Sequence, residues 1–310
     1  MTGILENMNP AGCRLFVDVG QTGSRVQDAL GVRHSISKGF APGTQIEDLL
    51  RDVLSEIDQS QAGTVVMSLT GLRGKVPVLT ELASVCVELT GCSSLGVCDD
   101  GLAWSVGSLE GKDGVALAVG GGVVVVARHG NNFVHLDGNG SDFGDSGSAY
   151  WLGRKGIRSA IRAIEGSDRH TFLGELFVQR FGPHDEFVRT HVAKDEIHKA
   201  FIAFSSDVLQ SAEAGDEIAS QIVISAAERL GALAVASAEQ AGLGDTRARV
   251  ALGGGLMRNS GYRDLVRRRI KSERDNFEVV EPVGNALDGL ERLEQLGRKN
   301  IMSLMKWWSA

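Results

Sequence analysis

The chain of 310 residues contains little of what marks several large protein classes. Its net charge of −7 leaves no basic footprint, which excludes a general binder of nucleic-acid phosphates. The first residues lack the basic start and the apolar core of a signal peptide. Apolar stretches such as residues 115–127 are interrupted by glycine and are too short to span a bilayer. We therefore expect a cytoplasmic protein with neither a nucleic acid nor a membrane as partner.

Cysteine is scarce, and its spacing is uninformative for metal binding. The four cysteines form no CxxC pair and no zinc-like pattern; they are Cys13, Cys86, Cys92 and Cys98. Buried, reduced thiols of a cytosolic protein are the simplest interpretation.

Two common phosphate-binding patterns, GxxxxGK[ST] and GxGxxG, are also missing from the glycine-rich turns. What is present is a set of 40 glycines gathered between apolar runs. Three glycine turns directly follow apolar segments, at residues 20–23, 120–122 and 253–255. Glycine lets backbone N–H groups approach an anion closely, although any single turn could simply be a hairpin or a bulge. Three such turns, with aspartates at strand ends, favour a phosphate-binding protein.

The hydrophobic pattern alternates between strand and helix periods, which predicts an α/β protein with a mixed sheet. The chain also exceeds the ~250–300 residues at which single cores stop growing, so we expect two domains. The expected strands of the first half are 13–19, 24–30, 32–37, 65–69 and 95–98, and its helices are 46–57, 77–89 and 101–109.

The pattern then restarts. A strand, glycine turn, strand unit occurs at residues 16–26 and again at 116–126, a weak internal repeat that suggests two related domains facing one another. The second half is largely helical. Its expected strands are 115–119, 123–128, 133–136, 248–252 and 277–280, and its clearest helices are 218–234 and 262–270. A last leucine stripe at residues 287–296 is expected to pack on the first domain.

Several stretches resemble one protein family. VDVGQTGS at residues 17–24 is similar to the first phosphate loop of the actin-like sugar kinases. GDSGSAYWLGR at 144–154 resembles the GDEGSGYWIGR signature of the N-acetylglucosamine kinase and BadF/BadG/BcrA/BcrD ATPase family. The resemblance extends to AEAGDEIASQIV at 212–223 and ALGGGLMRN at 251–259, and it covers nearly the whole chain in family order.

The resemblance implies a two-domain, actin-like ATPase (ribonuclease H-like) fold. Each domain would be a mixed five-stranded sheet flanked by helices. The N-terminal domain would contain residues 1–112 plus about 288–310, and the C-terminal domain residues 113–287.

The resemblance also implies residue roles. Asp18 would hold Mg²⁺, and Asp100 would be the catalytic base that accepts the proton of a sugar hydroxyl, with Asp99 the less favoured member of the pair. The residues expected to bind ATP are Gly20, Gln21, Thr22, Gly23, Ser24, Gly120, Gly121, Gly122, Gly253, Gly254 and Gly255. The residues expected to bind the sugar are Gly71, Asp100, Gly144 and Asp145.

Local structural explanations stand beside these roles. Asp18 could form a turn at the end of its strand, and Asp99 and Asp100 could cap the helix that begins near Gly101. Trp307 and Trp308 are expected to pack or to bind a partner chain rather than a sugar.

The function implied is ATP- and Mg²⁺-dependent phosphorylation of N-acetylglucosamine or glucosamine, by in-line transfer in a cleft between the two domains of the chain. A homodimer is a possible assembly. Relatives usually carry GTGS in the second phosphate loop, whereas this chain has Gly120-Gly121-Gly122-Val123. An asparagine that reads sugar hydroxyls is replaced by GFAPGTQ at residues 39–45, and the signature's glutamate is Ser146. Two alternatives therefore stay open: an ATPase coupled to a partner protein, and a catalytically weakened relative that senses sugar.

Overall fold

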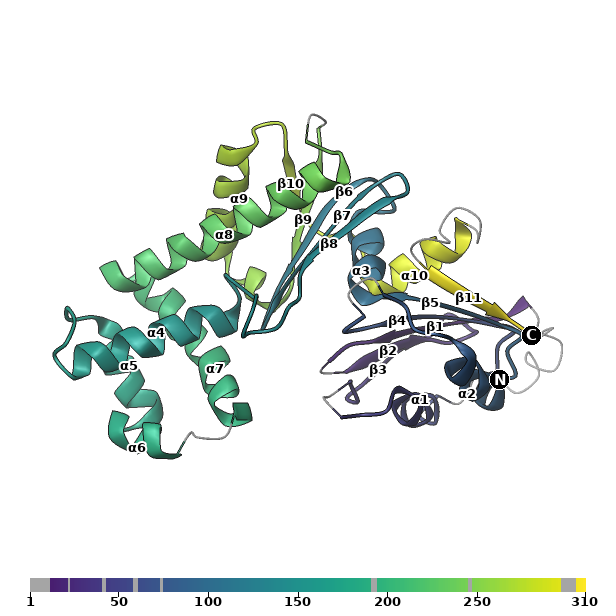
Figure 1. The fold of residues 1–310 in the computed structure, drawn as a ribbon, viewed down its shortest axis with the longest axis horizontal. Coiled ribbons are helices and arrows are strands. Elements are labelled where there is room, and N and C mark those ends of the chain that lie inside the picture. The colour runs from purple at the N-terminus through teal and green to yellow at the C-terminus, as the bar shows by residue number, and fades with distance from the viewer. Residues whose placement is uncertain are drawn as a thin grey trace. The chain divides into compact units, whose positions relative to one another are not determined.

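The computed structural model describes residues 12–21, 23–40, 43–57, 61–72, 75–190, 194–244, 247–296 and 305–310. These residues divide into two compact units. Unit 1 lies within Met1–Asp113, Arg128–His135 and Pro282–Ala310, and unit 2 within Gly114–Ala127 and Leu136–Glu281. Each unit is built around a β-sheet of its own (Figure 1).

The sheet of unit 1 has the strand order β11-β5-β4-β1-β2-β3. Three of its strands run parallel: β1 (Arg14–Val19), β4 (Thr64–Leu69) and β5 (Ser94–Asp99). At one side, β2 (Ser24–Gln27) and β3 (Arg33–Ile36) continue from β1 as an antiparallel meander. At the other side, β11 (Met305–Ser309) pairs antiparallel with β5. The carboxyl ends of β1, β4 and β5 therefore meet at one edge of the sheet.

The sheet of unit 1 has six strands, one more than expected. The additional strand, β11, is a short edge strand with no alternation of apolar and polar residues, so its pattern did not reveal it. Its two tryptophans pack on opposite sides: Trp308 lies against the α1–α2 side of the sheet and Trp307 against the other. The ring of Trp307 covers Gly96, where a Cβ would lie 2.8 Å from the ring.

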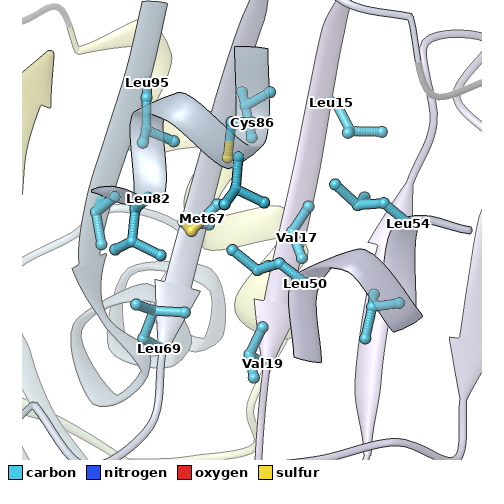
Figure 2. Packing of buried hydrophobic residues seen from close by; sticks show 14 of the residues in the cluster. Leu15, Val17, Val19, Leu50, Leu54, Met67, Leu69, Leu82, Cys86 and Leu95 are labelled. Carbon is cyan, nitrogen blue, oxygen red and sulfur yellow. The ribbon is translucent and has the colours of Figure 1, made fainter. Parts of the chain in front are cut away.

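Two layers of helices cover the sheet of unit 1. Leu15, Val17 and Val19 of β1 face α1 (Ile46–Leu54) and α2 (Thr80–Thr90), as Figure 2 shows. Phe16 points to the other face, where α3 (Asp100–Ser108) and α10 (Ala286–Gln295) pack. The leucine stripe expected at residues 287–296 thus packs in unit 1. The start of α2 at Thr80 lies later than expected, because Pro77 precedes the helix instead of beginning it.

Helices α3 and α10 approach so closely that their contact needs glycine. A Cβ on Gly289 would lie 1.7 Å from the carbonyl oxygen of Ala103, and one on Gly107 would lie 1.9 Å from that of Asn285. At the start of α10, next to Gly107, this contact is fixed by a capping box, in which Asn285 and Asp288 satisfy each other's backbone N–H groups. Because α3 begins at Asp100, the fit of α10 on α3 also fixes the helix that carries the predicted catalytic base.

We predict that Gly289→Ala lowers the free energy of unfolding by about 1–3 kcal/mol, the usual cost of overpacking a core. Chemical denaturation measures this change. The matched control is Gly174→Ala in α5 (Phe172–Phe181), where a Cβ would meet its nearest atom at an ordinary 3.5 Å. There the better helix propensity of alanine should leave stability equal or higher. Equal losses at both positions would contradict the close contact.

The sheet of unit 2 has the order β10-β9-β6-β7-β8. Its strands are β6 (Gly114–Val119), β7 (Val123–His129), β8 (Asn132–Asp137), β9 (Arg249–Gly253) and β10 (Glu278–Val280). The central pair β6 and β9 is parallel, and so is the pair β9 and β10. The carboxyl ends of β6 and β9 therefore lie together, and each runs directly into a glycine turn.

Helices make up most of the rest of unit 2. They are α4 (Ala149–Ile164), α5 (Phe172–Phe181), α6 (His184–Thr190), α7 (Lys194–Glu213), α8 (Glu217–Ala241), the 3-10 turn η3 (Gly255–Arg258) and α9 (Ser260–Glu273). Among the described helices, only α8 is long and apolar enough to cross a membrane by those two measures. It contacts α4, α7, α9 and β6, and a core helix passes the same test.

Candidate active site

The candidate site in unit 1 lies at the carboxyl edge of its parallel strands. The strand register places Arg25, Asp18, Ser68 and Cys98 side by side on β2, β1, β4 and β5. Residues paired directly across strands project on the same face of a sheet. Asp18 is thus bordered by a cation on one side and a hydroxyl on the other.

Asp18 is a buried carboxylate with only 6% of its surface exposed. Its Oδ1 accepts a hydrogen bond from Ser68 Oγ at 2.8 Å, and its Oδ2 lies 3.1 Å from Arg25 Nη1. Burial raises the pKa of Asp18, while the bonds from Ser68 and Arg25 oppose that rise. The cost of burying the charge is therefore only partly offset. A carboxylate in this state favours an additional cation nearby.

Two further acidic residues begin α3. Asp99 is 1% exposed and caps the helix, because its Oδ1 accepts from the N–H of Gly101 at 2.9 Å. His135 Nε2 lies 3.7 Å from the same oxygen. This geometry supports the capping explanation for Asp99.

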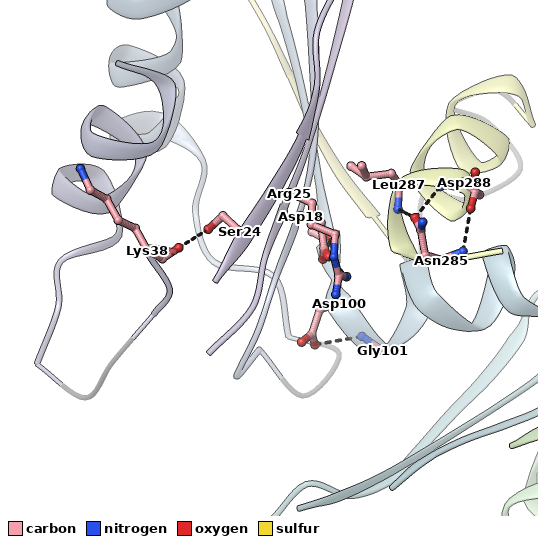
Figure 3. A network of polar contacts seen from close by, with 10 residues as sticks. Asp18, Ser24, Arg25, Lys38, Asp100, Gly101, Asn285, Leu287 and Asp288 are labelled. Carbon is pink, nitrogen blue, oxygen red and sulfur yellow. Dashed lines mark hydrogen bonds and ion pairs between the residues drawn. The ribbon is translucent and has the colours of Figure 1, made fainter. Parts of the chain in front are cut away.

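Asp100 is the first residue of α3 and is less buried than Asp99. Its carboxylate also accepts from the N–H of Gly101 (Figure 3). Burial, followed by the negative charge of Asp99, raises the pKa of Asp100 to about 7, and Asp18 adds to the rise. A hydrogen bond with Thr70 opposes it. A carboxylate with a pKa near neutral pH is suited to general acid–base catalysis.

The raised pKa of Asp100 predicts how the stability of the folded chain depends on pH. Between its ordinary pKa of 3.8 and about 7, the folded chain binds more protons at Asp100 than the unfolded chain does, so the stability contributed by this group falls as pH rises. We predict that Asp100→Asn raises the melting temperature at pH 8 and gains little at pH 4. One pKa unit corresponds to about 1.4 kcal/mol. Thermal melts at both pH values measure the difference, and a pH-independent difference would contradict the raised pKa.

The first glycine turn follows β1 and is held closed by the backbone. Gly20 N–H donates to the carbonyl of Gly23 at 3.0 Å, and Phe40 N–H donates to the carbonyl of Gly20 at 2.9 Å. Ser24 Oγ donates to the carbonyl of Lys38 at 2.7 Å, so this hydroxyl fixes the loop at residues 38–40. Gln21 is exposed. Thr22, which we expected to seat the phosphates of ATP, lies outside the described residues.

Gly71 follows β4 at the same edge as Asp18 and Asp100. It adopts φ +80°, and no atom would lie within 4 Å of a Cβ built on it. Unit 1 thus collects one part of the predicted site: Asp18, Asp100, Gly71 and the first glycine turn.

Sequence reasoning missed Arg25 and Ser68. The only available signal for Ser68 was a single hydroxyl inside the otherwise apolar run Val65–Leu69, next along the sheet to the strand of Asp18. Arg25 had no local signal, because its contact with Asp18 follows from the antiparallel register of β1 and β2.

Unit 2 collects the other predicted residues around two adjoining glycine turns. Ala118 of β6 pairs with Gly253 of β9, so the turns at 120–122 and 253–255 lie side by side. A Cβ on Gly254, whose φ is +95°, would lie 2.3 Å from the carbonyl oxygen of Val119. The two turns are therefore in direct backbone contact.

Asp145, which follows Gly144, lies against the second glycine turn. Asp145 is 8% exposed, and its Oδ1 accepts a hydrogen bond from the N–H of Val123 at 2.8 Å. The loop that carries them leads into α4, whose first N–H, that of Ala149, donates to the carbonyl of Gly120 at 2.8 Å. The residue expected to read a sugar is thus bonded to the turn expected to bind ATP.

We predict that Gly254→Ala lowers the free energy of unfolding by about 1–3 kcal/mol, since alanine is strained at this φ and would press on Val119. Gly255→Ala is the matched control, because no atom lies within 4 Å of its Cβ position. Denaturant titration of both variants separates backbone strain from a general effect of changing this turn. A stable Gly254→Ala variant would contradict the contact between the turns.

The carboxylates of unit 1 fit Mg²⁺, which keeps waters and substrate phosphates among its ligands, better than a metal ion whose ligands are all protein side chains. Among the described residues, no group of three or more His, Cys, Asp or Glu side chains is placed to hold a metal. Mg²⁺ usually keeps several waters and takes one or two carboxylates together with substrate phosphates. Asp18 and Asp100 offer such carboxylates, and burial raises the pKa of both.

Comparison with known proteins identifies the family. The model of the BadF/BadG/BcrA/BcrD ATPase family matches residues 16–290. The chain belongs to this family, as its motifs predicted. A search of curated proteins finds no match.

Solved structures confirm the fold. A candidate N-acetylglucosamine kinase from Chromobacterium violaceum superposes with a TM-score of 0.67 at 21% identity, covering 92% of this chain and 99% of that one. Another, from Porphyromonas gingivalis, gives 0.68 at 19% identity with the same coverage. A ROK family glucokinase from Streptomyces griseus, solved with glucose and AMPPNP, gives 0.54 at 17% identity and covers 93% of this chain and 100% of that one. The predicted actin-like fold of mixed sheets flanked by helices is therefore confirmed, with a sixth strand in the first sheet.

Proposed function

We propose that this protein is an ATP- and Mg²⁺-dependent kinase that phosphorylates a hydroxyl of an amino sugar, N-acetylglucosamine or glucosamine. The observation that carries the proposal is Asp100: a carboxylate with a pKa of about 7, at the same sheet edge as the first glycine turn. Membership in an ATPase family and the similarity to two candidate N-acetylglucosamine kinases support it.

In this proposal the side chains of unit 1 carry the acid–base chemistry. Asp100 accepts the proton of the attacking sugar hydroxyl, and the charges of Asp18 and Asp99 keep it basic enough for that at neutral pH. Asp18 would hold Mg²⁺ directly or through water, and the ion would neutralise charge on the phosphates. Arg25, with 56% of its side chain exposed, can turn from Asp18 towards an arriving anion.

The glycine turns would hold the nucleotide through backbone groups. Phosphoryl transfer asks a protein mainly to position two substrates and to offset negative charge, so N–H donors suffice where no side chain intrudes. The turns at residues 20–23 and 120–122 would receive the phosphates, and the turn at 253–255 would border the adenosine.

A coupled ADP-release assay over a panel of hexoses and amino sugars tests the proposal. We predict that Asp100→Asn lowers kcat by about 10²–10⁴-fold, the usual contribution of a general base, while the variant stays folded. Asp48→Asn, the same substitution at an exposed position of α1, is the control and should keep wild-type turnover. Wild-type turnover in Asp100→Asn would remove this residue from the mechanism.

The pH dependence gives a second test of the same residue. Because Asp100 must be ionised to accept a proton, kcat/KM of the wild type should fall below about pH 7, in line with its raised pKa. The residual activity of Asp100→Asn should lack this acidic limb. A wild-type profile that stays flat from pH 5 to 8 would contradict a base with this pKa.

The two alternatives make different predictions. A sugar-sensing relative would bind the amino sugar and release no ADP, and the absence of hydroxyl side chains in the Gly120–Gly122 turn favours this candidate over the partner-coupled ATPase. Activators of radical dehydratases carry an iron–sulfur cluster on cysteines, whereas all four cysteines here are buried. Burial raises the pKa of Cys86 to about 12, which disfavours the thiolate that a cluster requires.

A further inference from the structure

Asp145 directs its carboxylate at the second glycine turn of unit 2. Its Oδ1 accepts the N–H of Val123 at 2.8 Å, and a Cβ on Gly122 would lie 2.7 Å from the same oxygen. The glycine at position 122 is what allows the carboxylate to come this close. The contact therefore depends on both residues, on the carboxylate of Asp145 and on the absence of a side chain at Gly122.

Asp137 holds the backbone of Asp145 in place. Asp137, the last residue of β8, accepts the N–H of Asp145 on its Oδ1 at 2.9 Å. A Cβ on Gly144 would lie 2.0 Å from that oxygen, so this position too needs glycine. Asp137 and Asp145 adopt φ of +62° and +59°, a conformation that aspartate tolerates better than most residues. Asp137 thus fixes the backbone that aims the carboxylate of Asp145.

The rest of the turn is tied down by its neighbours. The carbonyl of Val123 accepts the N–H of Gly138 at 2.9 Å, so both backbone groups of Val123 are engaged by the segment 138–145. Inside the turn, Gly120 N–H donates to the carbonyl of Gly122 at 2.9 Å. Three consecutive glycines lose more conformational entropy on ordering than any other sequence would. A turn of this composition needs external bonds to keep one shape.

We propose that Asp137 and Asp145 form a chain of two hydrogen-bonded carboxylates, here called the relay, that holds the Gly120–Gly122 turn in the shape that receives the nucleotide. The inference rests on the proposed kinase function and deepens it. It makes Asp145 a positioning residue for the nucleotide, where the family resemblance implied a contact with sugar. Asp137, which sequence reasoning did not single out, acts through Asp145.

The test uses substitutions that tolerate the left-handed backbone. Asp137→Gly removes the carboxylate without adding strain, and Asp137→Asn keeps an acceptor oxygen in the same conformation. We expect Asp137→Gly to weaken AMPPNP binding by about tenfold and to raise KM for ATP, with KM for the sugar within about twofold. Asp137→Asn should recover most of the affinity, because a charged acceptor contributes only modestly more than a neutral one. Titration calorimetry and steady-state kinetics on the full chain provide the values.

Asp275→Gly is the control for this substitution, since Asp275 is exposed in the turn after α9 and should bind AMPPNP like the wild type. If Asp137→Gly fails to fold, Gly122→Ala tests the same contact by displacing the carboxylate of Asp145 with a methyl group. It should also weaken AMPPNP binding selectively. Unchanged AMPPNP affinity in the folded variants, or an increase in sugar KM alone, would overturn the relay.

Amide hydrogen exchange at Val123 separates the relay from the kinase proposal. Exchange there should be slow in the wild type and at least about tenfold faster in Asp137→Gly, because Asp145, whose carboxylate accepts this N–H, is no longer held in place by Asp137. If the wild type binds no AMPPNP, the kinase proposal fails, and the relay is then judged by this measurement alone. Exchange at Val123 that is equally fast in both proteins would overturn it.

Discussion

The burial of the Asp18 carboxylate is the constraint on which the rest of unit 1 depends. A charge in an apolar strand is costly unless it is hydrogen-bonded or paired. Here the hydroxyl of Ser68 and the guanidinium of Arg25 come from the two neighbouring strands, so the charge is accommodated only when β2, β1 and β4 are in register. A slip of one residue would turn Asp18 into the opposite core. The acidic edge therefore depends on the correct sheet, and the alternating apolar residues of β1 specify that sheet.

The electrostatics of Asp100 follow from this arrangement. Asp18 is bonded to Ser68 and Arg25 inside the sheet, Asp99 caps α3, and Asp100 is the third acidic group at the same place. Like charges in a poorly solvated environment disfavour each other's ionisation. The residue that is least buried, and therefore most able to meet a substrate, is the one whose pKa reaches about 7. Burial, together with the charges of Asp99 and Asp18, thus raises the pKa of Asp100 into the range suited to proton transfer.

Much of this could be predicted from the sequence, because long apolar runs that end on aspartate or glycine are local signals. The runs at Val17 and Val115 gave the central strands, and the signature at Gly144 gave the family. Contacts set by register or by distant segments could not be predicted. Arg25 meets Asp18 across a hairpin, and Asp137 meets Asp145 across a loop. The short strand β11 belongs to its sheet only because Trp307 and Trp308 find clusters formed by residues far away in the chain.

The two units contribute different kinds of chemistry, and this difference determines how each tolerates change. In unit 1 the proposed acid–base groups are side chains, so a conservative substitution such as aspartate to asparagine alters charge and leaves the fold in place. In unit 2 the proposed groups are backbone amides of glycine turns, and a Cβ added at Gly254 or Gly122 meets a carbonyl or a carboxylate. A single substitution can therefore change the proposed acid–base chemistry of unit 1. The turns of unit 2 can change only together with the residues that support them, such as Asp137 and Asp145.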